Sequence, residues 1–166
     1  AGHALTISAR RPEKLEEAGE SLRSEGFEVH VVTANMTQEE EITALFAAHR
    51  EKYGRLDALV NNAGIGIGGP MDQIETKRLD MQLDINLRAL IIGTREGLPL
   101  LREAGAEHQK ALIINTASIA GKHGQPFLSV YGATKAAVIN FTEATMRENI
   151  DNGVQCTALA PAFVDT

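Results

Sequence analysis

Tyr131 and Lys135 are the two residues whose types and spacing point most directly to chemistry. They stand four residues apart in the run Tyr-Gly-Ala-Thr-Lys, and helical spacing would place the phenol and the ammonium on one face. A free phenol, with a pKa of about 10, is a poor base at neutral pH, but a fixed positive charge beside it favours the phenolate. The pair predicts a tyrosine that gives or takes a proton, with Lys135 supplying the charge.

Polar residues follow two apolar runs earlier in the chain. Ser118 comes soon after residues 111–114, which read as a buried strand, and the run Asn61-Asn62-Ala63-Gly64 ends a second such strand. Open α/β sheets place their sites beyond the carboxyl ends of the strands. A hydroxyl at Ser118 could therefore face Tyr131.

These motifs together resemble the short-chain dehydrogenase/reductase family. The resemblance covers the whole chain and rests on Asn-Asn-Ala-Gly at residues 61–64, then Asn86, Ser118 and Tyr131-x-x-x-Lys135, in this order and at these intervals. It implies hydride transfer between a nicotinamide and a carbonyl carbon. Tyr131 would give or take the proton of the substrate oxygen, and Ser118 would hold that oxygen by a hydrogen bond.

The resemblance also implies how the cofactor is held. Lys135 would keep the phenol acidic and fix the nicotinamide ribose, and Asn86 would hold a water that links Lys135 to solvent. The expected cofactor contacts are Tyr131 and Lys135, then Asn62, Ala63 and Gly64 on the adenosine side, and Pro161, Val164 and Thr166 near the nicotinamide. Ala162 stands where the family has glycine. Its methyl group would strain a position that needs a positive φ, whereas most other approach geometries tolerate alanine.

The residues after the first strand favour NADP(H) over NAD(H). Family members that prefer NAD carry an acidic residue there, whereas this chain has Ala9, Arg10 and Arg11. Without a carboxylate to repel it, a 2′-phosphate could be bound by the Arg10 guanidinium, with Arg11 as helper. The alternative is a solvated arginine pair at the start of a helix. Asn35 resembles the position that contacts adenine.

A glycine-rich stretch imitates a nucleotide-binding motif. Residues 64–69 satisfy G-x-G-x-x-G literally, after a strand and before a helix. The fingerprint belongs to a βαβ unit of about 30 residues, but here the next strand begins near Ala111. We therefore expect a turn beside the cofactor, rather than the pyrophosphate site.

Strands and helices alternate along the whole chain. The expected strands span residues 3–8, 28–33, 57–60, 111–115 and 154–159. The expected helices span residues 13–23, 37–53, 70–103 and 130–149, the second opened by a Thr37/Glu40 capping box and ended by Gly54. This alternation predicts one α/β domain over residues 1–166, a doubly wound, Rossmann-like parallel sheet between two helical layers.

The resemblance predicts that both ends of this domain are incomplete. The family opens with a strand, a Gly-rich turn and a helix that hold the pyrophosphate, and it continues past Thr166 with a substrate-covering segment. The absent strand would lie mid-sheet, so two inner edges would remain unpaired and prone to aggregate. Either the natural polypeptide is longer, or ordered segments are missing from this sequence.

Composition narrows the choice of partners. A formal net charge of −6, with no basic cluster beyond Arg10 and Arg11, argues against nucleic acid and anionic membranes and favours a small-molecule partner. The resemblance implies that this partner is a carbonyl or alcohol substrate. Apolar runs too short to span a membrane and the lack of an opening signal peptide predict a cytoplasmic protein. Cys156, the only cysteine, is expected to be a core thiol, and the five histidines lack metal-ligand spacing.

Two classes of function remain. The favoured one is an NADP(H)-dependent oxidoreductase acting on a ketone or secondary alcohol, because all four catalytic positions carry the required side chains. The alternative is a truncated, non-catalytic binding or scaffold relative. Apolar residues on two helical regions further predict a homo-oligomer, a tetramer or a dimer: Leu79, Leu83, Leu87, Leu90, Ala136, Ile139, Phe141 and Met146.

Overall fold

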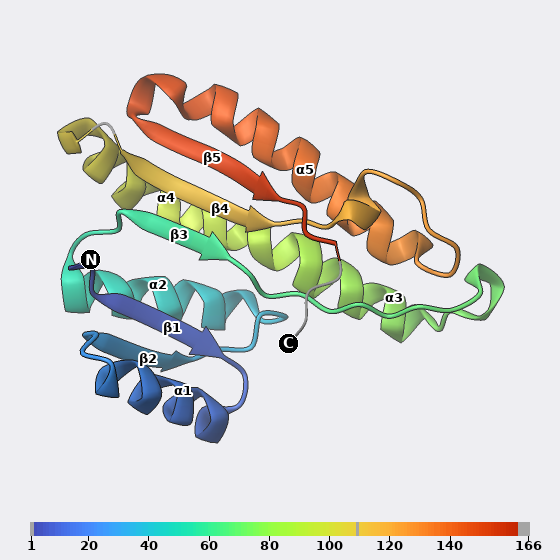
Figure 1. Cartoon of the computed structure of the whole chain (residues 1–166), viewed down its shortest axis with the longest axis horizontal. Coiled ribbons are helices and arrows are strands. Elements are labelled where there is room, and N and C mark those ends of the chain that lie inside the picture. Colours follow the sequence, from blue (N-terminus) through green and yellow to red (C-terminus); the bar gives the residue numbers. More distant parts are fainter. Residues whose placement is uncertain (1, 109, 163–166) are drawn as a thin grey trace. The chain divides into compact units, whose positions relative to one another are not determined.

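The computed structural model describes residues 2–108 and 110–162, which form two compact units, Ala1–Gly54 and Arg55–Thr166 (Figure 1). Both units are built from parallel strands that alternate with helices, so the predicted α/β class is confirmed. Within the described residues, no helix is long and apolar enough to cross a membrane. That the whole chain forms one domain stays a prediction.

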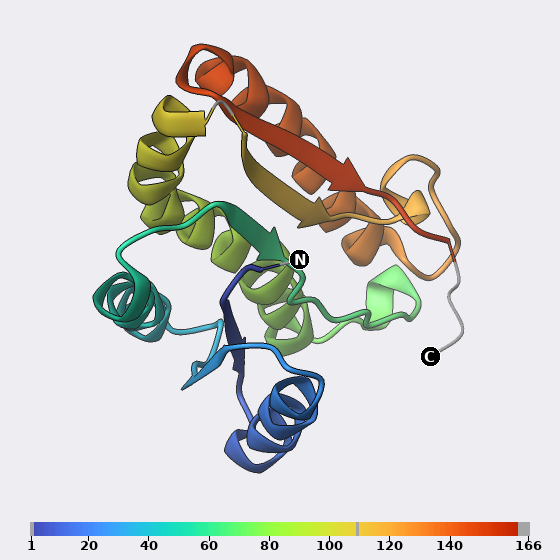
Figure 2. The ribbon, with the colours of Figure 1, turned by 60° about the vertical axis from the view of Figure 1, so that its left-hand side comes forward.

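The first unit is a two-stranded parallel sheet with a helix on each face. It contains β1 (Leu5–Ala9), α1 (Pro12–Ser24), β2 (Val29–Thr33) and α2 (Glu39–Tyr53), and the two helices lie on opposite faces of the strand pair (Figure 2). Leu15 of α1 and Ile42 of α2 are its most deeply buried large apolar side chains. The helix α2 ends at Gly54, whose φ of 66° is left-handed, as the sequence predicts.

The predicted capping box at the start of α2 is wrong. The N-cap is Gln38, and no side chain caps the helix. Instead, the backbone N–H and the hydroxyl of Thr37 both donate to Oδ1 of Asn35, at 3.2 and 3.1 Å, while the Asn35 N–H donates to Glu41. By forming this local Asx-type turn, Asn35 takes the Thr37 N–H that Glu40 would accept in a capping box. The helix therefore begins two residues later than predicted.

The second unit is a three-stranded parallel sheet in the order β3-β4-β5. Its strands are β3 (Ala58–Asn61), β4 (Ala111–Thr116) and β5 (Val154–Leu159). Its helices are η1 (Met71–Gln73), α3 (Thr76–Leu83), a π-helical turn (Asp84–Arg88), α4 (Ala89–His108), η3 (Ile119–Gly121), α5 (Ser129–Asn149) and η4 (Ile150–Asn152). In β4, alternate residues are buried, as expected for a strand covered on one face.

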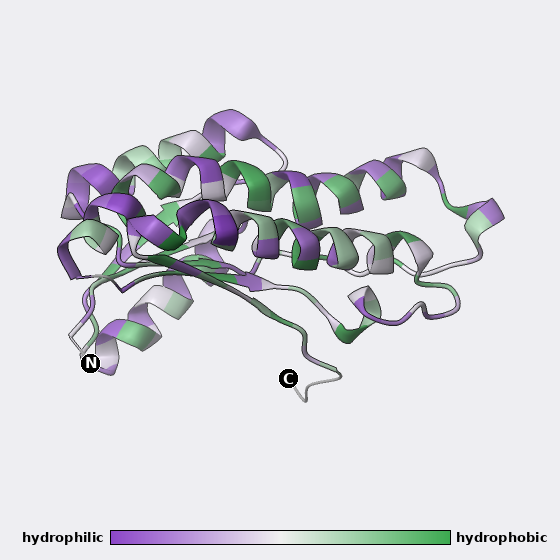
Figure 3. Ribbon diagram, turned by 90° about the horizontal axis from the view of Figure 1, so that it is seen from above, coloured by the Kyte–Doolittle hydropathy of each residue, from purple (hydrophilic) through white to green (hydrophobic). Residues whose placement is uncertain are grey.

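The long helices of this unit cover one face of its sheet. Both α4 and α5 lie behind the strands in Figure 1 and form a layer above them in Figure 3. Ile113 and Cys156 are buried beneath this layer, whereas Val60 and Leu159 are more than half exposed. Side chains of the sheet are therefore buried where they face the helical layer.

The long helical region predicted at about residues 70–103 is helical over most of its length but is not one continuous helix. The segment is divided into η1, α3, a π-helical turn and α4. The π turn inserts one residue per turn and carries Asn86 into the interior, where only 1% of its surface is exposed.

Half of the apolar residues from which an oligomer is predicted pack inside the unit. Leu90 joins Ala117 and Val138 in a buried cluster, against which Leu87, Ile139 and Phe141 pack. Of the other four, Leu83, Ala136 and Met146 are exposed and Leu79 is half-buried. The oligomer stays a prediction, and fewer exposed apolar residues support it than the sequence suggested.

Candidate active site

The carboxyl ends of the three strands in the second unit are tied together by hydrogen bonds. The Thr116 hydroxyl, at the end of β4, donates to Oδ1 of Asn62, which follows β3, at 2.9 Å. The Ile119 N–H donates to the carbonyl of Pro161, which follows β5, at 3.0 Å. Asn62 and Pro161, both predicted cofactor contacts, thus lie at the sheet edge where parallel α/β sheets carry their ligands.

Tyr131 and Lys135 lie one turn apart near the start of α5, as their spacing predicts. The Lys135 ammonium is 5.8 Å from the centre of the Tyr131 ring and donates to the Thr116 carbonyl at 2.7 Å. Only 3% of Lys135 is exposed, and this burial lowers the pKa of its ammonium. The strand end therefore fixes the lysine beside the phenol.

Ser118 lies two residues beyond β4 and opens the short helix η3. Its Oγ accepts a hydrogen bond from the Ala120 N–H at 3.2 Å, so the hydroxyl proton is available to a further acceptor. Two glycines press η3 against α5: a methyl group at Gly121 would lie 2.6 Å from the Lys135 backbone, and one at Gly132 would lie 2.9 Å from the Ala120 carbonyl. Any side chain there would push Ser118 away from α5.

The side chain of Asn86 holds the segment after β3 through hydrogen bonds to the backbone of that segment. Its Oδ1 accepts from the Ile65 N–H at 2.7 Å, and its Nδ2 donates to the Ile65 carbonyl at 2.8 Å and to the Thr134 hydroxyl at 3.1 Å. Thr134 in turn donates to the Tyr131 carbonyl. Both N–H donors of the Asn86 amide are therefore engaged, and its role of holding a water that links Lys135 to solvent stays a prediction.

A second polar network lies beneath the site and joins β3, β4 and α5. Asn61 donates to Thr94 and to Oδ1 of Asn115, at 3.1 and 2.9 Å, and Asn115 donates to Thr142 at 2.9 Å. Thr142 then donates to the Val138 carbonyl. Asn115 is wholly buried, so the sheet and α5 are joined by satisfied hydrogen bonds as well as by packing.

Residues 64–69, hereafter the glycine segment, lie beside Tyr131 and Lys135. A methyl group at Gly64 would lie 3.4 Å from the Lys135 ammonium, and one at Gly66 would lie 3.8 Å from the Tyr131 ring. No helix begins directly after the segment, because η1 starts at Met71 and α3 at Thr76. This placement does not match a pyrophosphate-binding fingerprint, which opens a helix, and a turn beside the cofactor stays a prediction.

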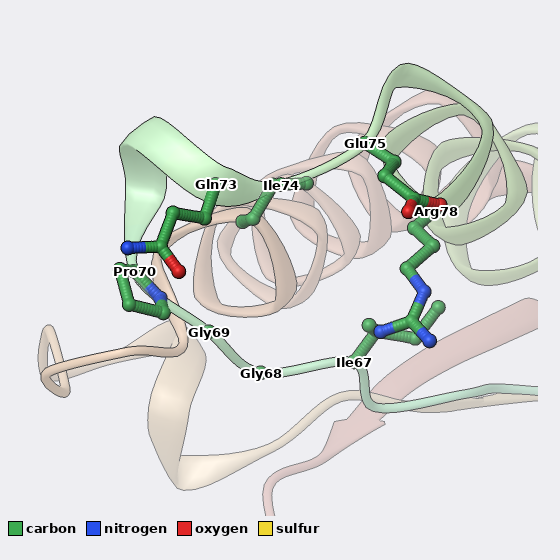
Figure 4. A pocket seen from close by; sticks show the side chains of 8 residues that line it. All are labelled: Ile67, Gly68, Gly69, Pro70, Gln73, Ile74, Glu75 and Arg78. Atoms are coloured by element: carbon green, nitrogen blue, oxygen red, sulfur yellow. The ribbon is translucent and has the colours of Figure 1, made fainter.

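A hollow of about 200 Å³ lies between the glycine segment and the start of α3 (Figure 4). Arg78 extends across it toward Ile67, and Gln73 and Glu75 add further polar groups. Tyr131 and Ser118 do not line the hollow, so it is separate from the candidate reaction centre.

The predicted cofactor residues of the first unit share one sheet edge. β1 and β2 end in register, with Ala9 opposite Thr33, so Arg10 and Asn35 follow adjacent strand ends. Arg10 and Arg11 are both exposed, and Arg11 is the N-cap of α1. Their contact with a cofactor phosphate, like that of Asn35 with adenine, stays a prediction.

The remaining predicted cofactor contacts stay predictions. Ala63 is exposed beside Asn62 and Gly64, as a cofactor contact requires, whereas Val164 and Thr166 lie outside the described residues. Sequence reasoning missed Gln82, Thr116 and Thr134. Thr116 ends a strand and could have been found from that place, but Gln82 and Thr134 look like ordinary helical residues.

Comparisons with known proteins agree with this architecture. The family model for short chain dehydrogenases matches residues 1–166. An uncharacterized oxidoreductase, YxjF of Bacillus subtilis (strain 168), is 32% identical over 165 residues, which are 99% of this chain and 63% of that protein. The chain therefore spans less than two thirds of the length of this relative.

Two solved structures superpose closely on the chain. A gluconate 5-dehydrogenase from Burkholderia cenocepacia J2315, in complex with NADP and tartrate, is 27% identical, with a TM-score of 0.90 over 99% of this chain and 63% of its own. A 3-ketoacyl-(acyl-carrier-protein) reductase from Brucella melitensis, complexed with NADH, is 30% identical, with a TM-score of 0.88 over 95% of this chain and 64% of its own. With a family match over its whole length and oxidoreductases among its relatives, the chain belongs to the short-chain dehydrogenase family.

Proposed function

We propose that the full-length protein is an NADP(H)-dependent oxidoreductase that transfers hydride between the nicotinamide and a ketone or secondary alcohol, with Tyr131 as the acid or base. One observation carries the proposal. The Lys135 ammonium is fixed by the Thr116 carbonyl at 2.7 Å and lies 5.8 Å from the centre of the Tyr131 ring. The pair thus presents a phenolic O–H and a fixed cation together at the strand ends, the arrangement that proton transfer to and from a substrate oxygen needs.

The residues around this pair fit a nicotinamide cofactor. An ammonium has three N–H donors, so Lys135 can bind ribose hydroxyls while it holds the Thr116 carbonyl. Gly64 lacks the side chain that would crowd this ammonium, and Asn62, Ala63 and Gly64 are all exposed at the sheet edge. The bound nicotinamide would supply or accept the hydride.

The other residues orient the substrate and the tyrosine. Ser118 uses a lone pair for the Ala120 N–H, so its O–H hydrogen can be donated to the substrate oxygen. During reduction Tyr131 would then deliver its phenolic proton to that oxygen, and during oxidation it would take the proton back. In this scheme Asn86 acts by holding the Ile65 backbone and, through Thr134, the first turn of α5.

The preference for NADP(H) rests on the first unit. Both cofactors occur among the solved relatives, NADP in the gluconate 5-dehydrogenase and NADH in the 3-ketoacyl reductase, so the relatives do not decide between them. The exposed Arg10 and Arg11, with Ala9 in place of an acid, support binding of a 2′-phosphate.

The test is the substitution Tyr131→Phe in the full-length protein, assayed for ketone reduction with NADPH. It removes one oxygen and keeps the ring, so turnover should fall by about 10²–10⁴-fold through lost proton transfer while NADPH affinity stays within twofold. Tyr53→Phe, the same change in the only other tyrosine of the chain, is the control and should leave turnover unchanged. Near wild-type turnover in Tyr131→Phe would favour the non-catalytic binding or scaffold alternative.

A further inference from the structure

Gln82 is the least expected buried residue in the second unit. It lies in α3, a helix whose other residues are exposed or half-buried, yet none of its own surface is exposed. Its Oε1 accepts a hydrogen bond from the Ile67 N–H at 3.0 Å. Within the described residues, its Nε2 is buried without a hydrogen-bond partner, so this glutamine carries an energetic cost that a methionine of similar size would not.

Gln82 and Asn86 act on the same stretch of backbone. They stand four residues apart on consecutive helical segments, and they bind residues two apart in the glycine segment, Ile67 and Ile65. The Gly69 N–H continues this alternation by donating to the Phe127 carbonyl at 2.8 Å. Every second N–H, from Ile65 to Gly69, is therefore held by a fixed acceptor, as in an extended chain.

Two glycines of this segment, Gly64 and Gly66, face the reaction centre. Methyl groups added at Gly64, Gly66 and Gly68 would meet, in turn, the Lys135 ammonium, the Tyr131 ring, and the Phe127 carbonyl with the Leu128 side chain. A glycine-rich chain is intrinsically loose, because glycine has the largest choice of backbone conformations. The position of Gly66 against Tyr131 thus depends on the anchors on either side of it.

We propose that Gln82 is a positioning residue, which together with Asn86 clamps the glycine segment so that Gly66 forms a fixed wall beside Tyr131. Asn86 alone holds Ile65 on one side of Gly66, and Gln82 holds Ile67 on the other. The proposal rests on the proposed oxidoreductase function for its kinetic consequence, but the clamp itself is a property of the fold. It also explains why an amide with an unpartnered N–H is kept in this helix.

The first arm of the test measures the clamp without any catalysis. Amide hydrogen exchange of the full-length protein should show a protected Ile67 N–H in the wild type. In Gln82→Met, which keeps the length of the side chain and removes the acceptor, exchange at Ile67 should be about five- to tenfold faster, with Ile65 unchanged. Gln82→Glu keeps an oxygen at the same reach and should retain protection.

The second arm measures the consequence for the reaction. Gln82→Met should lower kcat by about 10- to 100-fold, because a small displacement at the reacting centre is enough for that loss, while the NADPH dissociation constant stays within twofold. Gln82→Glu should recover most of kcat. Gln155→Met, the same change at an exposed site on β5, is the control for loss of a glutamine and should match the wild type.

Each outcome has one meaning. Rapid exchange of Ile67 in the wild type, or equal exchange in the wild type and Gln82→Met, overturns the clamp. Altered exchange with an unchanged kcat shows that the clamp does not position the site. If Gln82→Met does not fold, exchange of the Ile67 N–H is compared in the wild type and Gln82→Glu. Protection in both supports the clamp, and rapid exchange in either one overturns it. If the wild type itself reduces no ketone, the proposed function fails, while the exchange arm still decides whether Gln82 holds the segment.

Discussion

Replacing Lys135 by methionine would test whether a buried charge underlies the site. The change keeps the length of the side chain and removes the ammonium, which donates to the Thr116 carbonyl at 2.7 Å and is 3% exposed. Loss of this charge-assisted hydrogen bond lowers the stability of the folded protein by about 1.5–3 kcal/mol. Removing the buried charge also removes its desolvation penalty, which raises the stability by several kcal/mol. The two effects oppose each other, so we expect a net change of at most about 2 kcal/mol in the free energy of unfolding at pH 7.

The pH dependence of stability separates these two effects. Burial lowers the pKa of Lys135 in the folded protein below its unfolded value of about 10.4. Between the two values, the unfolded chain binds a proton that the folded chain has lost, so the stability of the wild type rises with pH by up to about 1.4 kcal/mol per unit. Below the folded value both states hold the proton, and this contribution to the slope is zero.

The measurement is urea unfolding of the full-length protein without cofactor, from pH 7 to pH 10, followed by far-UV circular dichroism. The free energy of unfolding of the wild type minus that of Lys135→Met should be flat at the lower end and rise toward pH 10. Lys122→Met, which removes an exposed lysine of the same unit, is the control for loss of a surface charge. A difference that falls with pH, or that stays flat throughout, would refute the buried-charge argument.

Two further predictions concern the cofactor and the core. Arg10→Asp should weaken NADPH binding by about 10- to 150-fold, the equivalent of 1.5–3 kcal/mol, and spare NADH; fluorescence titrations in which both cofactors lose affinity equally would contradict the phosphate contact. Asn115→Leu should lower the free energy of unfolding by about 2–5 kcal/mol, because Asn61 and Thr142 each lose a buried hydrogen bond. Urea unfolding with Gln155→Leu as the exposed control checks this, and a loss below 1 kcal/mol would mean that the network contributes little.

The sequence predicted the strands of the second unit and the residues at their ends closely. The strand predicted over residues 154–159 coincides with β5, and the one over residues 111–115 misses β4 by a single residue. Such runs are apolar, short and bounded by turns, so their local pattern alone specifies them. Since parallel strands bring their carboxyl ends to one edge, Asn62 and Ser118 could be placed near that edge without a structure.

Prediction failed where a side chain forms a hydrogen bond to the backbone, because the local sequence pattern does not reveal that bond. Thr37 and Glu40 satisfy the capping-box spacing, but Asn35 binds Thr37 first, and the helix starts after it. Spacing rules treat each helix end in isolation, whereas two polar side chains near one end compete for the same donors.

The same limit applies to the clamp beside Tyr131, which no helical pattern would reveal. Gln82 and Asn86 stand four residues apart, but they belong to α3 and to the π-helical turn that follows it, and their partners are backbone atoms in a glycine segment that precedes them. The motif residues Tyr131 and Lys135 can be read from one helix because their spacing alone places them on one face. The wall facing them is set by hydrogen bonds to side chains about 15 to 21 residues away in sequence, so its geometry had to come from the structure.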